Sequence, residues 1–139
     1  MWTFEYTHPT TARPDAIWRL WSDVASWPDW DVDLEVVTLD GDFAPGARGT
    51  LKPKGMDVFP FVLTRAEPDR GYSDETPLDG AVLRFDHDIL PADDGHVLRQ
   101  RVTVDGPAAN EYFAPLAANI ILDIPQALAR LADRAERLS

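Results

Sequence analysis

His87 is the polar side chain of this sequence with the clearest capacity for chemistry. In the extended run Ala81–Ile89 it alternates in phase with Phe85, so its imidazole is expected on an apolar face. An imidazole in that position could orient a ligand or act as a general base near neutral pH. The structural alternative is an inward histidine held by hydrogen bonds, or one fixed by its neighbours Asp86 and Asp88.

Gln100 has the corresponding position on the next extended run, in phase with Leu98 and Val102. A buried amide needs hydrogen-bond partners, because leaving it unsatisfied costs about 1–3 kcal/mol. Those partners are either other protein groups or a ligand. With His87, Gln100 is predicted to form one polar spot in an apolar interior, unless both side chains are satisfied within the fold.

Large aromatic side chains could line a cavity as well as fill a core. Phe59 and Phe61 share one strand face and Phe85 lies on another, while the remaining candidates are expected near a cavity mouth or in its lining. With the polar pair they make up the predicted ligand-binding set: Trp27, Trp30, Phe59, Phe61, Tyr72, Phe85, His87, Gln100 and Tyr112. Core packing is the alternative for each ring taken singly.

Other site chemistries lack the residues that they need. There is no cysteine, and His8, His87 and His96 have no ligand spacing on one element, so neither a metal nor a cofactor is expected. No Gly-x-Ser-x-Gly or nucleotide-binding glycine motif occurs. The run Asp29–Asp33 lacks the turn glycine and terminal glutamate of a calcium loop, and its acids are expected to face water.

The composition fits one globular domain over residues 1–139, because 45% hydrophobic residues suffice for a single core. A formal net charge of −11 argues against binding to nucleic acid or to anionic membranes. No apolar run reaches the roughly 20 residues of a membrane span. The first residues show no secretion signal, which together with the absence of cysteine favours a cytoplasmic location.

The elements that would position these side chains begin with residues 2–7, whose alternation predicts a half-buried strand. Four of the five tryptophans lie between Ala12 and Asp31. Pro14 suits the first turn of a helix, and the spacing of Ile17 and Trp21 places them on its buried face. A second short helix or a tight turn is expected at Ser26–Trp30.

After Asp31 the spacing of apolar residues becomes typical of strands, and in the last third it becomes typical of a helix. Six short extended runs bounded by glycine, proline or aspartate predict an antiparallel meander. They are Leu34–Leu39, Ala47–Lys54, Val58–Ala66, Gly71–Thr76, Ala81–Leu90 and His96–Asp105. Apolar steps of three, four and seven from Phe113 to Leu138 then predict one long helix, kinked near Leu122 by Pro125. An antiparallel sheet with helices on one side is an α+β fold, in the order β-α-α-β6-α.

Three segments resemble the polyketide cyclase/dehydrase-like group of the START, or helix-grip (SRPBCC), superfamily. They are Pro14–Asp31 with its Trp-Pro-Asp-Trp turn, the turn Pro45–Gly49, and Val102–Pro107 leading into the last helix. The resemblance implies a curved sheet of about seven strands wrapped around a long C-terminal helix, with an internal hydrophobic cavity. It implies no particular reaction, because members include cyclases, aromatases, transport proteins and co-chaperones.

Three functions stay open at this point. The first is binding of a small hydrophobic ligand, whether aromatic, polyketide or lipid-like, between the sheet and the C-terminal helix. The second is an aromatase, cyclase or dehydratase in which His87 or a nearby acid moves protons, which requires at least two inward polar groups near one point of the cavity. The third is a protein-interaction or regulatory module, or a homodimer, that uses an exposed Trp27–Trp30 turn; a buried turn would count against it.

Overall fold

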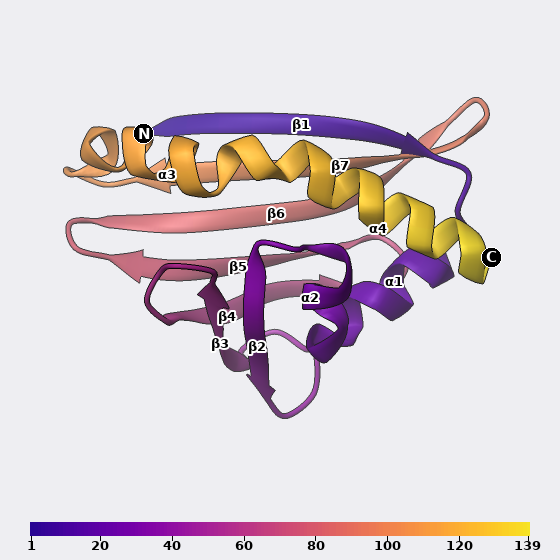
Figure 1. Cartoon of the computed structure of the whole chain (residues 1–139), viewed down its shortest axis with the longest axis horizontal. Helices are drawn as coiled ribbons and strands as arrows, with labels where there is room; N and C mark the ends of the chain where they lie inside the picture. Colours follow the sequence, from indigo (N-terminus) through magenta and orange to yellow (C-terminus); the bar gives the residue numbers. More distant parts are fainter.

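A curved antiparallel sheet of seven strands forms the body of the molecule in the computed structural model, which describes residues 1–139 (Figure 1). The strands are β1 (Trp2–Thr10), β2 (Leu34–Asp40), β3 (Arg48–Pro53), β4 (Phe59–Glu67), β5 (Gly71–Leu78), β6 (Ala81–Ala92) and β7 (Gly95–Asp105). Their order is β1-β7-β6-β5-β4-β3-β2, so β2 to β7 form a meander and β1 pairs with β7. The predicted six-stranded meander is confirmed.

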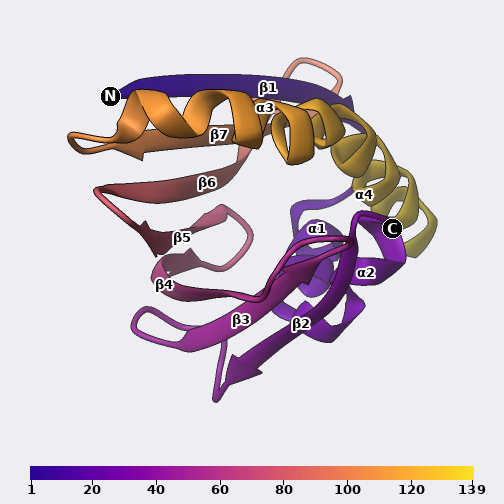
Figure 2. The same ribbon diagram turned by 60° about the vertical axis from the view of Figure 1, so that its left-hand side comes forward.

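Helices cover one face of this sheet (Figure 2). Helices α1 (Pro14–Ser22) and α2 (Trp27–Trp30) follow β1, whereas α3 (Phe113–Asn119) and α4 (Ile124–Leu138) follow β7. The sheet curls so that α3 and α4 lie across its open side, and α1 and α2 lie near the C-terminal end of α4. This is the predicted α+β helix-grip fold, in the order β-α-α-β6-α.

The C-terminal helical segment is interrupted, where the sequence predicts one long kinked helix. Helix α3 ends at Asn119, a 3₁₀ turn spans Ile121–Asp123, and α4 begins at Ile124, with an angle of about 40° between the two parts. Pro125 lies in the first turn of α4, where its missing N–H leaves no helical hydrogen bond unmade. No single helix is long and apolar enough to cross a membrane, and the two parts pass that test only as a bent pair.

The tryptophan-rich segment Ala12–Asp31 is built into the core. Trp21 on α1 is 1% exposed, and its ring meets Tyr72 edge-on, with 5.3 Å between the centroids. Trp27 donates its Nε1 hydrogen to the carbonyl oxygen of Trp21 at 3.0 Å, which ties α2 to α1. Trp27 and Trp30 are 5% and 7% exposed. Both tryptophan side chains of the turn are therefore buried, although Asp29 between them is exposed, which counts against an interaction module that uses these rings.

Candidate functional site

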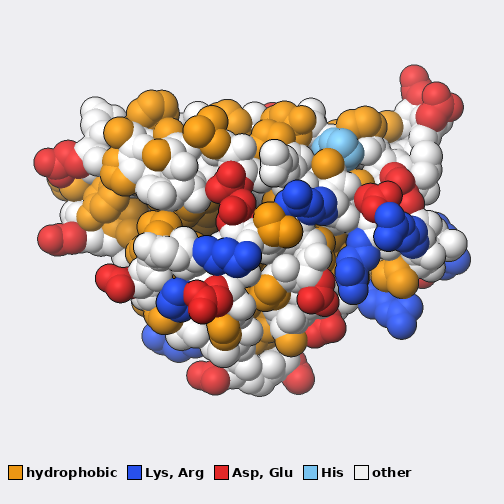
Figure 3. Space-filling model, viewed as in Figure 1, with side chains coloured by type: hydrophobic (Ala, Val, Ile, Leu, Met, Phe, Trp, Pro, Cys, Tyr) orange, Lys and Arg blue, Asp and Glu red, His pale blue; other side chains and the backbone are white.

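A cavity of about 130 Å³ lies between the concave face of the sheet and helices α2, α3 and α4. Figure 3, which shares the view of Figure 1, shows hydrophobic side chains gathered in a recess beneath α3. The aliphatic part of the lining consists of Leu34, Leu51, Pro53, Leu78, Leu83, Leu116, Ile120, Ile124 and Ala127. An apolar cavity at this place is what the helix-grip arrangement leaves between a curled sheet and the helices across its open side.

Seven of the nine residues that the sequence predicts for the ligand site line this cavity. They are Trp27, Trp30, Phe59, Tyr72, Phe85, His87 and Gln100. The sequence thus identifies side chains from α2, β4, β5, β6 and β7 that the fold brings to one space. Their contact with a ligand stays a prediction.

The structure places Phe61 and Tyr112 outside the cavity. Phe61 is buried and stacks on Trp27, with 6.2 Å between ring centroids and 23° between ring planes. Its ring also fills the space above Gly49, where a side-chain carbon would overlap it. Tyr112 donates its hydroxyl hydrogen to the carbonyl oxygen of Asp79 at 2.7 Å. The first ring therefore packs the core, and the second fastens the start of α3 to the β5–β6 turn.

Strand register gathers the polar part of the lining on β5, β6 and β7. His87 pairs across the sheet with Tyr72 on one side and with Gln100 on the other. Asp74 lies two residues along β5 from Tyr72, so it is a diagonal neighbour of His87 on the same face. Asp74, His87 and Gln100 all line the cavity, so its wall contains more than one polar group.

His87 is buried in the cavity wall, with 8% of its surface exposed. Its ring stacks on Tyr72 with a centroid distance of 4.1 Å and an interplanar angle of 8°. The Nδ1 atom has no hydrogen-bond partner within the protein. Burial lowers the pKa of His87 from 6.5 to about 4, so the imidazole is neutral at pH 7.

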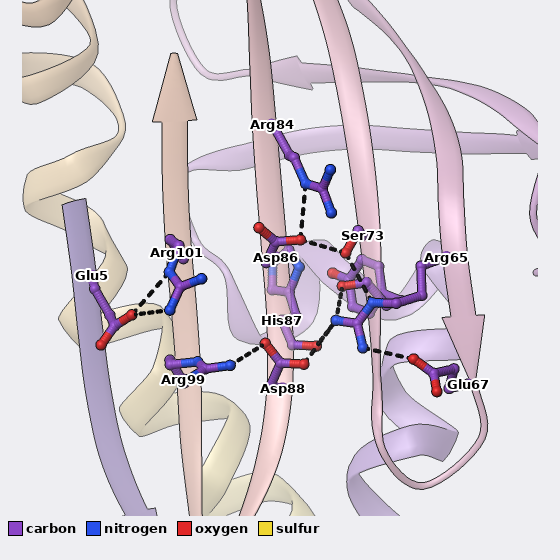
Figure 4. Close-up of polar contacts among 11 residues, drawn as sticks. Glu5, Arg65, Glu67, Ser73, Arg84, Asp86, His87, Asp88, Arg99 and Arg101 are labelled. Atoms are coloured by element: carbon purple, nitrogen blue, oxygen red, sulfur yellow. Dashed lines mark hydrogen bonds and ion pairs between the residues drawn. The ribbon is translucent and has the colours of Figure 1, made fainter. Parts of the chain in front are cut away.

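The acids beside His87 do not hold its ring. Asp86 and Asp88 point to the opposite face of the sheet, where they join a network of ion pairs and hydrogen bonds (Figure 4). Ser73 donates its hydroxyl hydrogen to Asp86 at 2.5 Å, and Arg65 contacts Asp88 at 2.8 Å. Arginine partners on that face are Arg65 and Arg99 for Asp88, Arg84 for Asp86 and Arg101 for Glu5. The structural alternative in which the two aspartates fix His87 is therefore wrong.

Asp74 is the most deeply buried acid among the cavity residues that sequence reasoning missed. Its side chain lies on the inner face of β5, is 4% exposed, and leaves Oδ1 without a hydrogen-bond partner. Burial raises the pKa of this carboxyl from 3.8 to about 8, and the charges of Asp86 and Glu75 act in the same direction. A signal was present, because Asp74 alternates in phase with Tyr72, which the sequence does assign to the site.

Three further acids, Asp31, Asp33 and Asp123, line the cavity where α2, the start of β2 and the α3–α4 break meet. Burial raises the pKa of Asp31 from 3.8 to about 6. Burial also raises the pKa of Asp123, and its interaction with Asp33 adds to the effect. The expectation that Asp31 and Asp33 simply face water is therefore wrong, because both are half-buried in the lining.

Comparison with solved structures finds the same fold in proteins of low sequence identity. A START superfamily protein from Mycobacterium smegmatis is 17% identical, with a TM-score of 0.71 and 99% of each chain covered. Norcoclaurine synthase from Thalictrum flavum, solved with dopamine and hydroxybenzaldehyde, is 16% identical, with a TM-score of 0.70 and with 99% of this chain and 85% of that one covered. At such identities the likeness shows the fold alone.

The di-domain ARO/CYC protein StfQ from the steffimycin biosynthetic pathway has a TM-score of 0.76 at 13% identity. The match covers 97% of this chain and 51% of StfQ, so the chain spans about half of that protein. No curated protein matches the sequence significantly. The profile of the family described as polyketide cyclase/dehydrase and lipid transport matches residues 1–136, and the chain therefore belongs to that family.

Proposed function

We propose that the protein binds a small molecule with a single aromatic ring in the cavity between the sheet and helices α3 and α4. The observation that carries this proposal is the size of the cavity, about 130 Å³, together with its apolar and aromatic lining. An apolar cavity of about 150 Å³ engineered into another protein accepts benzene. A long acyl chain or a fused polyketide would extend out of this volume towards solvent, whereas a single aromatic ring would fit within it, so we favour the aromatic class over the other two ligand classes.

The shape of the lining supports the same ligand. Phe59, Tyr72 and Phe85 present rings from the sheet, while Trp27 and Trp30 present theirs from α2. Rings in the lining suit an aromatic ligand, because stacked and edge-on contacts add to the free energy of apolar burial. The solved norcoclaurine synthase complex supports the proposal further, since dopamine and hydroxybenzaldehyde each contain one aromatic ring.

The proposal predicts that filling the cavity weakens binding. Ala127 is buried on α4 and lines the cavity, so Ala127→Leu places three additional carbon atoms in it. We expect this variant to bind toluene at least tenfold more weakly than the unaltered protein, as measured by NMR titration. Ala129→Leu makes the same change at a half-buried position on α4 that does not line the cavity, and should bind toluene normally. Equal binding by both variants would contradict the proposal.

A second candidate function is an aromatase, cyclase or dehydratase, and the convergence of Asp74 and His87 on one cavity favours it. At neutral pH burial keeps Asp74 mostly protonated and His87 neutral, which is the division needed between a general acid and a general base. In a dehydration, the imidazole of His87 would take the proton next to a ketone while Asp74 protonated the departing hydroxyl group to give water. Release of water from an aromatic β-hydroxy ketone tests this function, and unchanged turnover in His87→Gln would overturn it.

A further inference from the structure

Building on the proposed binding of an aromatic molecule, we infer that the natural ligand carries an amino group whose ammonium form pairs with Asp74. Ammonium ions supply three hydrogen-bond donors and no acceptor, which suits the unpaired Oδ1 of Asp74. The inference would make the cavity selective for aromatic amines over alcohols and acids of the same size.

The charges around the cavity favour a cation. Four carboxyl groups line it, from Asp31, Asp33, Asp74 and Asp123, and no lysine or arginine does so. The single histidine in the lining, His87, carries no charge at neutral pH. A carboxylate ligand would therefore enter a space of its own sign without a counter-ion, whereas an ammonium would be attracted.

Asp74 is the acid best placed to make the contact. Acids on the outer face of the same sheet have arginine partners, as Figure 4 shows for Glu5, Asp86 and Asp88. Asp74, one residue along β5 from the buried Ser73, faces the cavity and has no such partner. A buried carboxylate without a partner is unfavourable, so Asp74 stays protonated until a cation from outside the chain pairs with it.

Aromatic rings complete the recognition of an ammonium. Trp30 and Phe85 line the same cavity as Asp74, whereas the faces of Trp27 and Tyr72 are stacked against other rings. The face of an aromatic ring attracts a cation, and this attraction is strongest in a site that excludes water. A carboxylate at the sheet wall and rings around it together provide both kinds of contact that a small aromatic amine can use.

Binding of an ammonium must also displace the proton of Asp74. Asp86 and Glu75 lie near enough to raise the pKa of Asp74, and the other titratable groups in the lining are Asp31, Asp33, Tyr72, His87 and Asp123. Because the pKa of Asp74 is about 8, the free protein holds this proton at pH 7. An amine with a pKa of about 10 is already charged in solution, so complex formation should release close to one proton.

The test compares three probes by isothermal titration calorimetry: benzylamine, benzyl alcohol and benzoate. We expect benzylamine to bind at least tenfold more tightly than benzyl alcohol, and benzoate not to bind measurably. Asp74→Asn should weaken benzylamine at least tenfold and change benzyl alcohol less than twofold, which also shows that the variant is folded. Glu5→Gln is the control, because it removes a carboxylate that pairs with Arg101 on the outer face of the sheet, away from the cavity, and both affinities should stay within twofold.

Titrations in two buffers of different ionisation enthalpy count the released proton. The unaltered protein should release close to one proton with benzylamine at pH 7, and Asp74→Asn should release almost none. Equal affinity for benzylamine and benzyl alcohol, or an unchanged benzylamine affinity in Asp74→Asn, would overturn the inference and leave the proposed aromatic-binding function standing. Failure of both benzylamine and benzyl alcohol to bind would overturn the proposed function itself.

Discussion

Asp74→Leu is expected to raise the free energy of unfolding by about 2 kcal/mol or more at pH 8. The folded-state pKa of about 8 lies above the ordinary value of 3.8, so between these values the folded chain holds a proton that the unfolded chain has lost. Stability is therefore lost as the pH rises from about 4 to about 8, by up to about 1.4 kcal/mol per pH unit. Leucine removes this loss, because it does not titrate, and it places an apolar side chain in the cavity wall.

Urea unfolding at pH 6.5, 7.2 and 8 measures this effect. Over that interval the unaltered protein should become less stable, whereas Asp74→Leu and Asp74→Asn should change little. The asparagine variant separates the loss of the titrating group from the gain of apolar surface. A leucine variant that is less stable than the unaltered protein at pH 8 would contradict the account of Asp74 as an unfavourably buried acid.

His87 acts in the opposite direction at lower pH. Its folded-state pKa of about 4 lies below the ordinary value of 6.5, so the unfolded chain takes up a proton first as the pH falls. Stability is therefore lost between about pH 6.5 and pH 4, where Asp74 becomes less unfavourable. In that range His87 opposes Asp74 and also Asp31, whose pKa burial raises to about 6, and the interval above pH 6.5 isolates Asp74.

Trp21→Ala is expected to lower the free energy of unfolding by about 3–5 kcal/mol, because its fully buried ring leaves a large void. The ring also backs two residues of the cavity wall, at 5.3 Å from Tyr72 and 6.0 Å from His87 between centroids. Trp21→Ala should therefore also weaken the binding of toluene. The matched control is Trp18→Ala on the same helix, where a half-buried ring contacts Phe43 and should cost roughly 1–2 kcal/mol. Equal losses in the free energy of unfolding for the two variants, measured by urea unfolding, would contradict the placement of Trp21 at the centre of the core.

The alternation of apolar and polar residues made the strands and much of the site predictable. The predicted run Ala81–Leu90 differs from β6 only at its end, and His96–Asp105 differs from β7 by one residue at its start. The shared face of His87 and Gln100 follows from the same pattern, because a two-residue period records which side of a sheet is buried. Register then places these two residues opposite each other on adjacent strands.

The features that the sequence did not predict depend on contacts between distant segments. Alternation identifies the face on which Phe61 lies, but Gly49 and Trp27 decide that its ring packs the core instead of the cavity. The hydroxyl group of Tyr112 is directed by a carbonyl 33 residues away. Asp74 was missed because a search for apolar periodicity passes over an acid. The burial of this acid becomes visible only in the folded structure.

The apolar periodicity of the last third fits one helix as well as two. Buried residues recur from Leu116 to Ala135 on both sides of the break, so their spacing does not show where the helix breaks. Pro125 marks the region correctly, but a proline is compatible with either a kink or a new first turn. The packing of α3 and α4 across the curled sheet determines which of the two forms, and that packing depends on the whole fold.

Three buried polar atoms in the cavity residues, Asp74 Oδ1, His87 Nδ1 and Trp30 Nε1, lack partners within the protein. A laboratory selection for heat resistance alone would reward apolar replacements at these positions, since each removes an unsatisfied group. Such a selection would remove the groups that the proposed ligand uses, while it raises the thermal stability of the protein. Engineering of this chain therefore needs a binding screen beside any thermal one, and the positions at which the two screens disagree would map the site without knowledge of the ligand.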